Sequence, residues 1–333
     1  MSAAVDLQLF FIVGRGRSGT TLLARMLTQH PQLVVAPEGF FALSLRRRYL
    51  HARWDDACID AFCRDVVREN RMRTWRLDLD ALAGRLRAHR EGLDYAGACR
   101  LVYYAYAADV VGRPQVRGIG DKNPHYALFV PALIELFPGA RFVHIVRDPR
   151  DNVCSYRNVP FDLGNVAALA YRWRRYNEEI MAMRRSHPDR FLQVRYEDLV
   201  AEGERELERV SDFVGVRFDA AMLRFHEASD DGFYGRKSRW FSELRKPLDD
   251  GRVARWREQL GPRELQAIAA ICGAQAHELG YDLGTDARLG LRMRAGALVG
   301  RSSVAAERWV FGVVPHELRS ALINTYRRAS GRT

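Results

Sequence analysis

A short run of glycines and hydroxyl side chains has the residue types and the spacing that bind an anion. Gly14-Arg-Gly-Arg-Ser-Gly19 follows an almost uniformly apolar stretch, and Thr20 and Thr21 come directly after it. Glycines allow backbone N–H groups to turn toward an anion at the start of a helix, where the helix dipole also favours negative charge. The hydroxyls of Ser18, Thr20 and Thr21 add further donors. The loop therefore predicts a site for a phosphate-like group.

This loop departs from the phosphate-binding loop of kinases and nucleotide triphosphatases at one position. The pattern G-x-x-x-x-G-K-[ST] places a lysine after its second glycine, and this chain has Thr20 there. The lysine that normally clamps a β/γ-phosphate pair is therefore absent, and Arg17 can supply positive charge from within the loop. A P-loop kinase or nucleotide triphosphatase stays open as an alternative. Thr20 and the lack of a clear Mg²⁺-binding aspartate after an apolar strand argue against it.

The elements that must position the loop alternate between buried strands and helices. Apolar runs predict five strands, and helical spacing follows most of them; the strand segments are 7–14, 32–39, 116–124, 140–151 and the run from 190. Strands that alternate with helices predict an α/β fold, here a P-loop-like three-layer domain with a central parallel sheet flanked by helices. Ligands of such sheets bind beyond the carboxyl ends of the strands. The places to look are therefore 14–19, Glu38, 121–123 and 147–150.

Two ordered segments carry a family resemblance. "GRGRSGTTLLARMLTQHPQLVVAPEGF" resembles the 5′-phosphosulfate loop of sulfotransferases, nearest to the tyrosylprotein and bacterial branch. "FPGARFVHIVRDPRDNVCSY" is similar to the strand, loop and helix that bind the 3′-phosphate, and "RYEDLV" and "RKPLDDGRVARWREQL" follow in the family's order. The resemblance covers roughly residues 7–282. It implies a sulfotransferase domain over 1–285, with a helical acceptor-side insertion at about 40–111, and leaves 286–333 as a basic helical tail.

The resemblance implies a donor with charge at both ends, 3′-phosphoadenosine 5′-phosphosulfate (PAPS). The loop, through Arg17, Ser18, Gly19, Thr20 and Thr21, would hold the 5′ end. Arg147 and Ser155 suit the 3′-phosphate, because a planar cation at a strand end and a nearby hydroxyl can both donate to it. Two further residues match family positions near the nucleotide, Tyr196 and Lys246. The segment 229–250 would then order over the bound nucleotide as a lid.

The same resemblance implies catalytic roles for two residues. Lys122, in "GDKNP", resembles the lysine that contacts the leaving or bridging oxygen. Glu38, in "VVAPEG", resembles the glutamate base of the tyrosylprotein branch. His125 is the rival base, but the sulfotransferases that use a histidine place it two residues after the lysine, where this chain has Pro124. We therefore favour Glu38. Sulfuryl transfer needs no metal in principle, since cations and backbone donors can stabilise the developing charge.

Composition sets the remaining limits. The chain has 333 residues, of which 47% are hydrophobic and 28% charged, enough for a sizeable core. No apolar run reaches the roughly 18 residues of a membrane span, and no basic region of a signal peptide precedes the first strand. Five cysteines without a CxxC pair predict reduced thiols and no zinc site. We therefore expect a cytoplasmic protein with no metal, while its oligomeric state stays open.

The charge balance favours anionic partners. The net charge is +11, and only three of the 52 basic residues are lysines: Lys122, Lys237 and Lys246. The tail at 286–333 is rich in arginine and contains amphipathic segments. Two interpretations of it stay open: helices packed on the domain, or peripheral contact with an anionic surface such as a membrane.

Two questions about ligands stay open at the level of sequence. A non-enzymatic basic protein that binds nucleic acid or an acidic glycan would show a basic face with interleaved aromatics, and the arginines here are dispersed. We therefore expect no nucleic-acid partner. The acceptor can be a carbohydrate, a peptide tyrosine or a small metabolite. Residues 46–48, three arginines, and the tyrosine cluster at 103–106 are candidate acceptor contacts, although a solvated helix face and a packed core explain them better.

Overall fold

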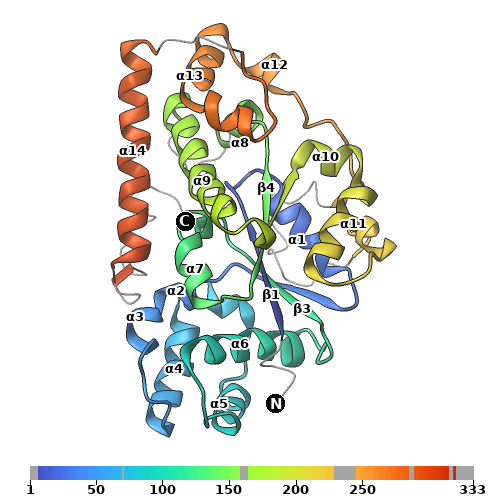
Figure 1. Cartoon of the computed structure of the whole chain (residues 1–333), viewed down its shortest axis with the longest axis vertical. Coiled ribbons are helices and arrows are strands. Elements are labelled where there is room, and N and C mark those ends of the chain that lie inside the picture. The colour runs from blue at the N-terminus through green and yellow to red at the C-terminus, as the bar shows by residue number, and fades with distance from the viewer. Residues whose placement is uncertain are drawn as a thin grey trace.

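The computed structural model describes residues 7–69, 71–157, 164–228, 245–284, 289–314 and 318–319. At the centre of these residues lies a sheet of five parallel strands in the order β2-β3-β1-β4-β5 (Figure 1). The strands are β1 (Gln8–Val13), β2 (Leu33–Ala36), β3 (Gly118–Lys122), β4 (Arg141–Val146) and β5 (Phe191–Arg195). Each falls within a segment that its apolar run predicts, so the α/β fold with a central parallel sheet is confirmed.

The side chains of the central strand β1 alternate between the two hydrophobic cores, one on each face of the sheet. Phe10 and Ile12 point to one face of the sheet, and Phe11 and Val13 point to the other, as successive residues of a strand must. Because helices cover both faces, every residue of β1 beyond Gln8 is buried. This explains why the strand is a continuous apolar run instead of an alternating one.

Helices form the two outer layers of the domain. Phe10 and Ile12 pack with α1 (Thr20–Thr28), α10 (Tyr196–Ala201), α11 (Gly203–Val214) and the 3₁₀ turn η5 (Ala220–Arg224). Phe11 and Val13 pack with α7 (Val130–Leu136), α9 (Val166–Ser186) and the helices between β2 and β3. The three-layer arrangement predicted from the sequence is therefore present.

The chain between β2 and β3 forms a helical lobe below the sheet in Figure 1. Its elements are α2 (Phe41–Ser44), α3 (Arg46–Tyr49), α4 (Asp56–Arg68), η1 (Met72–Trp75), α5 (Leu79–Ala88), α6 (Tyr95–Ala105) and the π-helical turn η2 (Tyr106–Val110). Asp55, Asp78 and Asp94 each accept backbone N–H groups at the start of α4, α5 and α6. Such caps satisfy donors that have no partner inside the helix.

One predicted helix is divided in the structure. The sequence favours a single helix over 125–139, whereas the chain forms the 3₁₀ turn η3 (Pro124–Leu128) and then α7. The Asn123 side chain accepts the N–H of His125 and starts the turn. Pro131 then stands in the first turn of α7, where its missing N–H has no intrahelical partner to lose. A second helix start is therefore built into the segment.

The remaining helices follow β4 in the chain. They are α8 (Pro149–Arg157), α12 (Trp256–Gln259), α13 (Pro262–Glu278) and α14 (Leu291–Gly312), with the turn η4 (Pro188–Arg190) before β5. Helices α8, α13 and α14 pack against α9. The long helix α14 runs along α9 at the edge of the molecule (Figure 1). Among the described residues, no helix combines the length and apolarity that crossing a membrane would require.

Candidate active site

The glycine-rich loop joins β1 to α1 at the carboxyl end of β1. Gly19 ends the loop with a φ of +93°, a backbone conformation that favours glycine. A Cβ atom at Gly19 would lie 2.6 Å from Cδ2 of the Tyr196 ring. The loop therefore turns into α1 only because the residue at this position has no side chain. Gly19 and the first residues of α1, Thr20 and Thr21, line the same pocket as Tyr196.

A pocket opens at this end of the sheet, and most of the predicted donor-binding residues line it. Seven of the nine do so: Arg17, Gly19, Thr20, Thr21, Arg147, Ser155 and Tyr196. Ser18 is buried behind the loop, where its hydroxyl accepts a hydrogen bond of 3.0 Å from Nδ2 of Asn152. Lys246 is exposed and does not line the pocket, although the adjacent Pro247 does. Most of the predicted lid, 229–244, lies outside the described residues.

Arg17 joins the loop to helix α8. Its Nε donates to Oγ of Ser155 at 3.0 Å, across 138 residues of sequence. Burial lowers the pKa of the Arg17 guanidinium, and the neighbouring charges of Arg252 and Arg147 act in the same direction. Three arginines that share one partly buried pocket repel one another. One carboxylate, Asp249, lines the same pocket, so the pocket has an excess of positive charge that suits a ligand with several negative charges.

Arg147 begins immediately after β4 and extends across the pocket. Its Nη1 donates to the carbonyl of Arg17 at 3.3 Å and its Nη2 donates to the carbonyl of Arg252. The guanidinium carbon lies 4.6 Å from the centre of the Tyr196 ring. Nε of Arg147 is buried and has no hydrogen-bond partner among the described residues. A buried donor without a partner costs free energy, and the guanidinium that carries it lines the pocket.

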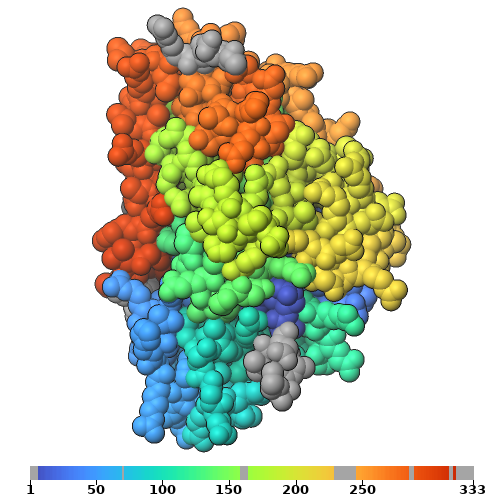
Figure 2. All heavy atoms as spheres, viewed as in Figure 1, coloured from blue at the N-terminus to red at the C-terminus, as the bar shows by residue number. Residues whose placement is uncertain are grey.

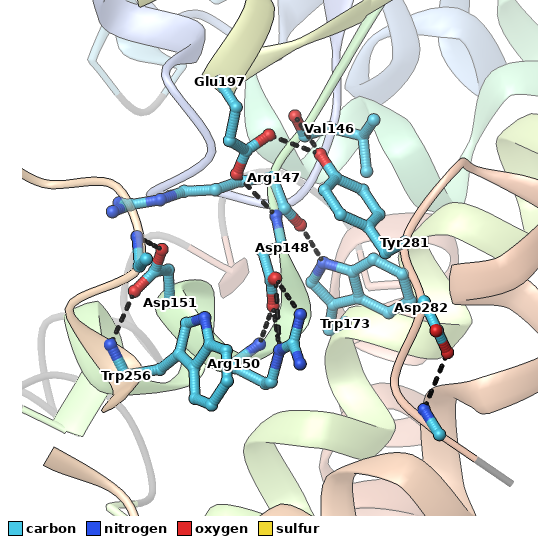
Figure 3. A network of polar contacts seen from close by, with 12 residues as sticks. Val146, Arg147, Asp148, Arg150, Asp151, Trp173, Glu197, Trp256, Tyr281 and Asp282 are labelled. Carbon is cyan, nitrogen blue, oxygen red and sulfur yellow. Dashed lines mark hydrogen bonds and ion pairs between the residues drawn. The ribbon is translucent and has the colours of Figure 1, made fainter. Parts of the chain in front are cut away.

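A polar network fixes the backbone from which Arg147 projects (Figure 3). Glu197 accepts the N–H of Asp148 at 3.0 Å and the hydroxyl of Tyr281 at 2.7 Å. Nε1 of Trp173 donates to the carbonyl of Arg147 at 3.0 Å. These bonds tie the end of β4 to α10, to α9 and to the segment after α13. The backbone position of Arg147 is therefore set by partners outside the pocket, and its side chain is held by Arg17, Arg252 and Tyr196 inside it.

The neighbouring charges of this segment also have defined partners. Arg150 pairs with Asp148 at 2.6 Å. Asp151 accepts the N–H groups of Ala254 and Trp256 at 2.8 and 2.9 Å (Figure 3). This tether holds the loop that brings Arg252 into the pocket. Arg252 belongs to the segment "RKPLDDGRVARWREQL", in which the family resemblance points only to Lys246.

Glu38 and Lys122 contact each other at the ends of β2 and β3. Nζ of Lys122 donates to Oε1 of Glu38, and a guanidinium nitrogen of Arg71 contacts Oε2 of Glu38. Lys122 is fully buried, and Glu38 retains a 20% exposed side chain. Lys122 pairs in register with Ile12 of β1, next to the glycine-rich loop. Glu38 and Lys122 were predicted from the sequence. Arg71 was not, because no motif in the sequence around Arg71 marks it as part of a site.

Burial strongly shifts the pKa values of Lys122 and of its neighbour in β3, Asp121. Burial, and then the charge of Arg71, lowers the pKa of Lys122 to about 7. Burial raises the pKa of Asp121 to about 7, against hydrogen bonds from the hydroxyls of Tyr103 and Tyr126 at 2.6 and 2.9 Å. Tyr103 is therefore part of the buried support for β3 and does not face a ligand. The packed-core interpretation holds for this tyrosine.

His125, the rival base, has different partners. Its Nδ1 pairs with Glu307 of α14, and its ring stacks on Phe311 at 4.5 Å between centres. Glu38 instead contacts the lysine that ends β3. The geometry thus separates His125 from the Glu38–Lys122 pair by engaging it with the last described helix. The arrangement favours Glu38 over His125 as the base.

Taken together, the fold and the site define a class of protein. It is an α/β enzyme domain with two arginines, Arg17 and Arg147, in one pocket and a carboxylate–lysine pair nearby, all at the carboxyl ends of the parallel strands. Among the described residues, no group of three histidine, cysteine, aspartate or glutamate side chains has metal-binding geometry. Comparison with known proteins gives the family. Residues 10–220 match the sulfotransferase family, and the chain belongs to it.

Individual relatives agree with this assignment. Protein-tyrosine sulfotransferase 1 of Danio rerio is 24% identical over 289 residues, covering 83% of this chain and 73% of its own. Nodulation protein NoeE of Sinorhizobium fredii is 27% identical over 331 residues, covering 90% and 71%. The sulfotransferase domain of the Synechococcus olefin synthase superposes with a TM-score of 0.60 at 25% identity, covering 84% and 97%. The kinase and the non-enzymatic alternatives are therefore set aside.

Proposed function

We propose that this enzyme transfers the sulfuryl group of PAPS to an acceptor hydroxyl, with Glu38 as the base and Lys122 at the leaving oxygen. The acceptor oxygen forms a bond to sulfur, while the bond between sulfur and the bridging oxygen of the donor breaks. Glu38 takes the proton of the hydroxyl. The electron pair stays on the 5′-phosphate of the product, 3′,5′-adenosine bisphosphate, and Lys122 and Arg17 stabilise that charge.

One observation carries the proposal: the order of the functional groups along the sheet edge. The strand order β2-β3-β1-β4 places Glu38, Lys122, the glycine-rich loop and Arg147 in that sequence. A donor with its 3′-phosphate at Arg147 and its 5′ end at the loop would direct its sulfuryl group toward Lys122 and Glu38. The acceptor hydroxyl would then enter from the side of the helical lobe.

The residues present fit a ligand with an anion at each end. The buried, unpartnered Nε of Arg147 and the hydroxyl of Ser155 suit the 3′-phosphate. Arg17 and the N-terminus of α1, with Thr20 and Thr21, suit the 5′-phosphate, because N–H groups and the helix dipole favour negative charge there. Lys246 stays a candidate contact from outside the pocket. Similarity to a protein-tyrosine sulfotransferase supports an acceptor that carries a hydroxyl group. A peptide tyrosine, a sugar and a small alcohol all carry such a group.

Isothermal titration with 3′,5′-adenosine bisphosphate, compared with ATP-Mg²⁺, tests the donor site. We expect micromolar binding of the bisphosphate and much weaker binding of ATP-Mg²⁺. Arg147→Ala should weaken bisphosphate binding by about 30-fold, or about 2 kcal/mol, as for the loss of a buried charge-assisted hydrogen bond. Arg185→Ala is the matched control, since Arg185 is exposed and pairs with Glu278 on the surface.

The opposite pattern would overturn the proposal. If ATP-Mg²⁺ bound as tightly as the bisphosphate, and Arg147→Ala behaved like Arg185→Ala, the pocket would not recognise a 3′-phosphate. The assigned donor would then be wrong even though the family is right.

A further inference from the structure

Arg71 contributes a cation to the catalytic carboxylate from outside the family's motifs. Lys122 contacts Oε1 of Glu38, and Arg71 contacts Oε2. A carboxylate offers about four lone-pair sites on its two oxygens, so two cations leave it able to accept a proton from a hydroxyl. Arg71 is separated from Glu38 by three helices of the lobe, and its side chain is 47% exposed.

The backbone of Arg71 is held in an unfavourable conformation. Its φ is +67°, in the left-handed region that residues with a side chain rarely adopt. Arg76, at the other end of the turn η1, has a φ of +52°. Such conformations cost free energy and persist where the surrounding structure determines them. The strained backbone of Arg71 is therefore maintained by the packing of the turn around it.

Turn η1 packs directly against the backbone next to the base. A Cβ atom at Gly39 would lie 2.6 Å from Sδ of Met72 and 3.2 Å from the Trp75 ring. The carbonyl of Gly39 accepts Nδ2 of Asn123 at 2.9 Å and the hydroxyl of Tyr126 at 3.0 Å. The loop that carries Glu38 is thus enclosed between η1 and the residues that follow Lys122.

A buried ion pair anchors the turn from behind. Glu69 and Arg319 pair at 2.6 Å, and both side chains are fully buried. The guanidinium of Arg319 lies 5.5 Å from the centre of the Phe40 ring, and Phe40 follows Glu38 by two residues. Removing one partner of a buried pair leaves an uncompensated charge, which is strongly unfavourable. Arg319 therefore holds together the two segments that carry Arg71 and Glu38.

From these contacts we propose that Arg71 is a positioning residue for sulfuryl transfer, which orients the Glu38 carboxylate and keeps it ionised for the acceptor hydroxyl. The inference rests on the proposed role of Glu38 as the base. A cation beside a carboxylate favours its charged form. Arg71 thus maintains the base in its proton-accepting state, and Lys122 remains directed to the leaving oxygen.

Variants of Arg71, with Glu38→Gln as a reference, test this role. The readouts are kcat, KM and the pH profile of kcat/KM with PAPS and a hydroxyl acceptor that the enzyme turns over, chosen from phenols, tyrosyl peptides and sugars. For Arg71→Met we expect kcat to fall about tenfold or more. The acidic limb of the profile should move to higher pH, because the base loses a cation that favours its ionised form. Arg71→Lys should restore part of both.

Arg76→Met is the matched control, because it removes an arginine with the same backbone strain from the other end of η1. It should leave kcat and the pH profile unchanged. Titration with 3′,5′-adenosine bisphosphate should give the same affinity for all these variants, which would show that they fold and that the donor site is intact.

The results separate this inference from the proposed function. If Glu38→Gln abolishes turnover while Arg71→Met matches the wild-type enzyme, the role of Arg71 is wrong and the base stands. A loss of kcat in Arg71→Met without any shift of the pH profile, or without rescue by lysine, would also refute the positioning role. If Glu38→Gln keeps full activity, the proposed base itself fails.

A separate observation concerns the outer face of α14. Leu291, Leu298 and Trp309 have relative exposures of 83%, 61% and 56%. They recur after about two and three helical turns, which places them on one side of the helix. The opposite side carries Gly300 and Val304, which are buried. In Figure 2, α14 forms the red-orange edge of the molecule, with its outer side uncovered in that view.

The charges of α14 identify the kind of surface that this face fits. Arg292, Arg294, Arg301 and Arg308 belong to the helix, and its only acidic residue is Glu307. Glu307 points inward, where it pairs with His125 and with Arg172. Arg308 pairs with Glu179 of α9 at 2.8 Å. The positive charge that accompanies the exposed apolar side chains therefore comes from Arg292, Arg294 and Arg301, which are exposed. Exposed apolar side chains beside arginines fit the interface of an anionic lipid membrane.

We propose that α14 docks this enzyme on an anionic lipid surface through Leu291, Leu298 and Trp309. Co-sedimentation with vesicles of phosphatidylglycerol and phosphatidylcholine should show binding that weakens with salt, and pure phosphatidylcholine vesicles should bind at least tenfold less. The double variant Leu298→Ser, Trp309→Ser should lose most of the binding. Val110→Ser, which alters an exposed valine on the helical lobe, is the matched control.

Two results would overturn the membrane proposal. One is the absence of binding to vesicles that contain phosphatidylglycerol. The other is a concentration-dependent dimer, seen by sedimentation without lipid, that the double variant abolishes; the face would then belong to a second copy of the chain.

Discussion

Replacement of Glu38 by glutamine is expected to lower kcat at least 100-fold while leaving the affinity for 3′,5′-adenosine bisphosphate within about twofold. The amide keeps the shape of the side chain but cannot take the acceptor's proton, and general-base catalysis contributes about 10²–10⁴-fold. The measurement is steady-state release of the bisphosphate from PAPS in the presence of an acceptor, with titration of the product in parallel. Glu135→Gln, an exposed glutamate paired with Arg46, is the matched control.

The contrary outcome points to a defined alternative. If Glu38→Gln stays active and His125→Gln loses turnover, the proton would pass to the His125–Glu307 pair. The contacts argue against this result, because Glu38 meets Lys122 directly and His125 is engaged with α14.

The variant Gly19→Ala should reduce bisphosphate binding by about 100-fold or more. The alanine Cβ would collide with the Tyr196 ring, and the positive φ of Gly19 adds strain for any residue with a side chain. Relief of the collision must move either the loop or the tyrosine, and both line the donor pocket. Titration calorimetry measures the loss, and circular dichroism shows whether the fold persists.

Gly84→Ala is the matched control for this substitution. Gly84 lies within α5, and a Cβ there would have no neighbour within 4 Å. Alanine in a helix interior should stabilise the chain by about 0.5–1 kcal/mol and leave donor binding unchanged. If Gly19→Ala retained the wild-type affinity for the bisphosphate, the assignment of the loop as the binding site of the 5′-phosphate would be wrong.

Signals that are local in sequence predicted the scaffold of the site. The apolar run before Gly14 and the glycine spacing after it are both local, so the strand, the loop and the start of α1 could be read directly. Glu38 and Arg147 stand at strand ends, which a parallel sheet brings to one edge. The resemblance to sulfotransferases then pointed to their roles, which stay proposals.

Residues whose position depends on tertiary contacts could not be predicted. Arg71 reaches Glu38 because turn η1 packs on Gly39. The residue types at 38–39 do not indicate which distant segment packs there. Arg252 enters the pocket because Asp151 holds the neighbouring backbone. The spacing of the tyrosine cluster at 103–106 fits both a core and a binding face, and only a tertiary contact, the hydrogen bond from Tyr103 to Asp121, assigns Tyr103 to the core.

The ion pair between Glu69 and Arg319 has a consequence for synthesis of the enzyme. Its partners lie 250 residues apart, so at about 5–20 residues per second the ribosome needs roughly 12–50 s to make the second after the first. During that interval the nascent chain already contains Glu38, Arg71 and Lys122, but Glu69 lacks its buried counter-ion. The buried side chain of Glu69 therefore gains this partner only after synthesis has passed Arg319, close to the end of the chain.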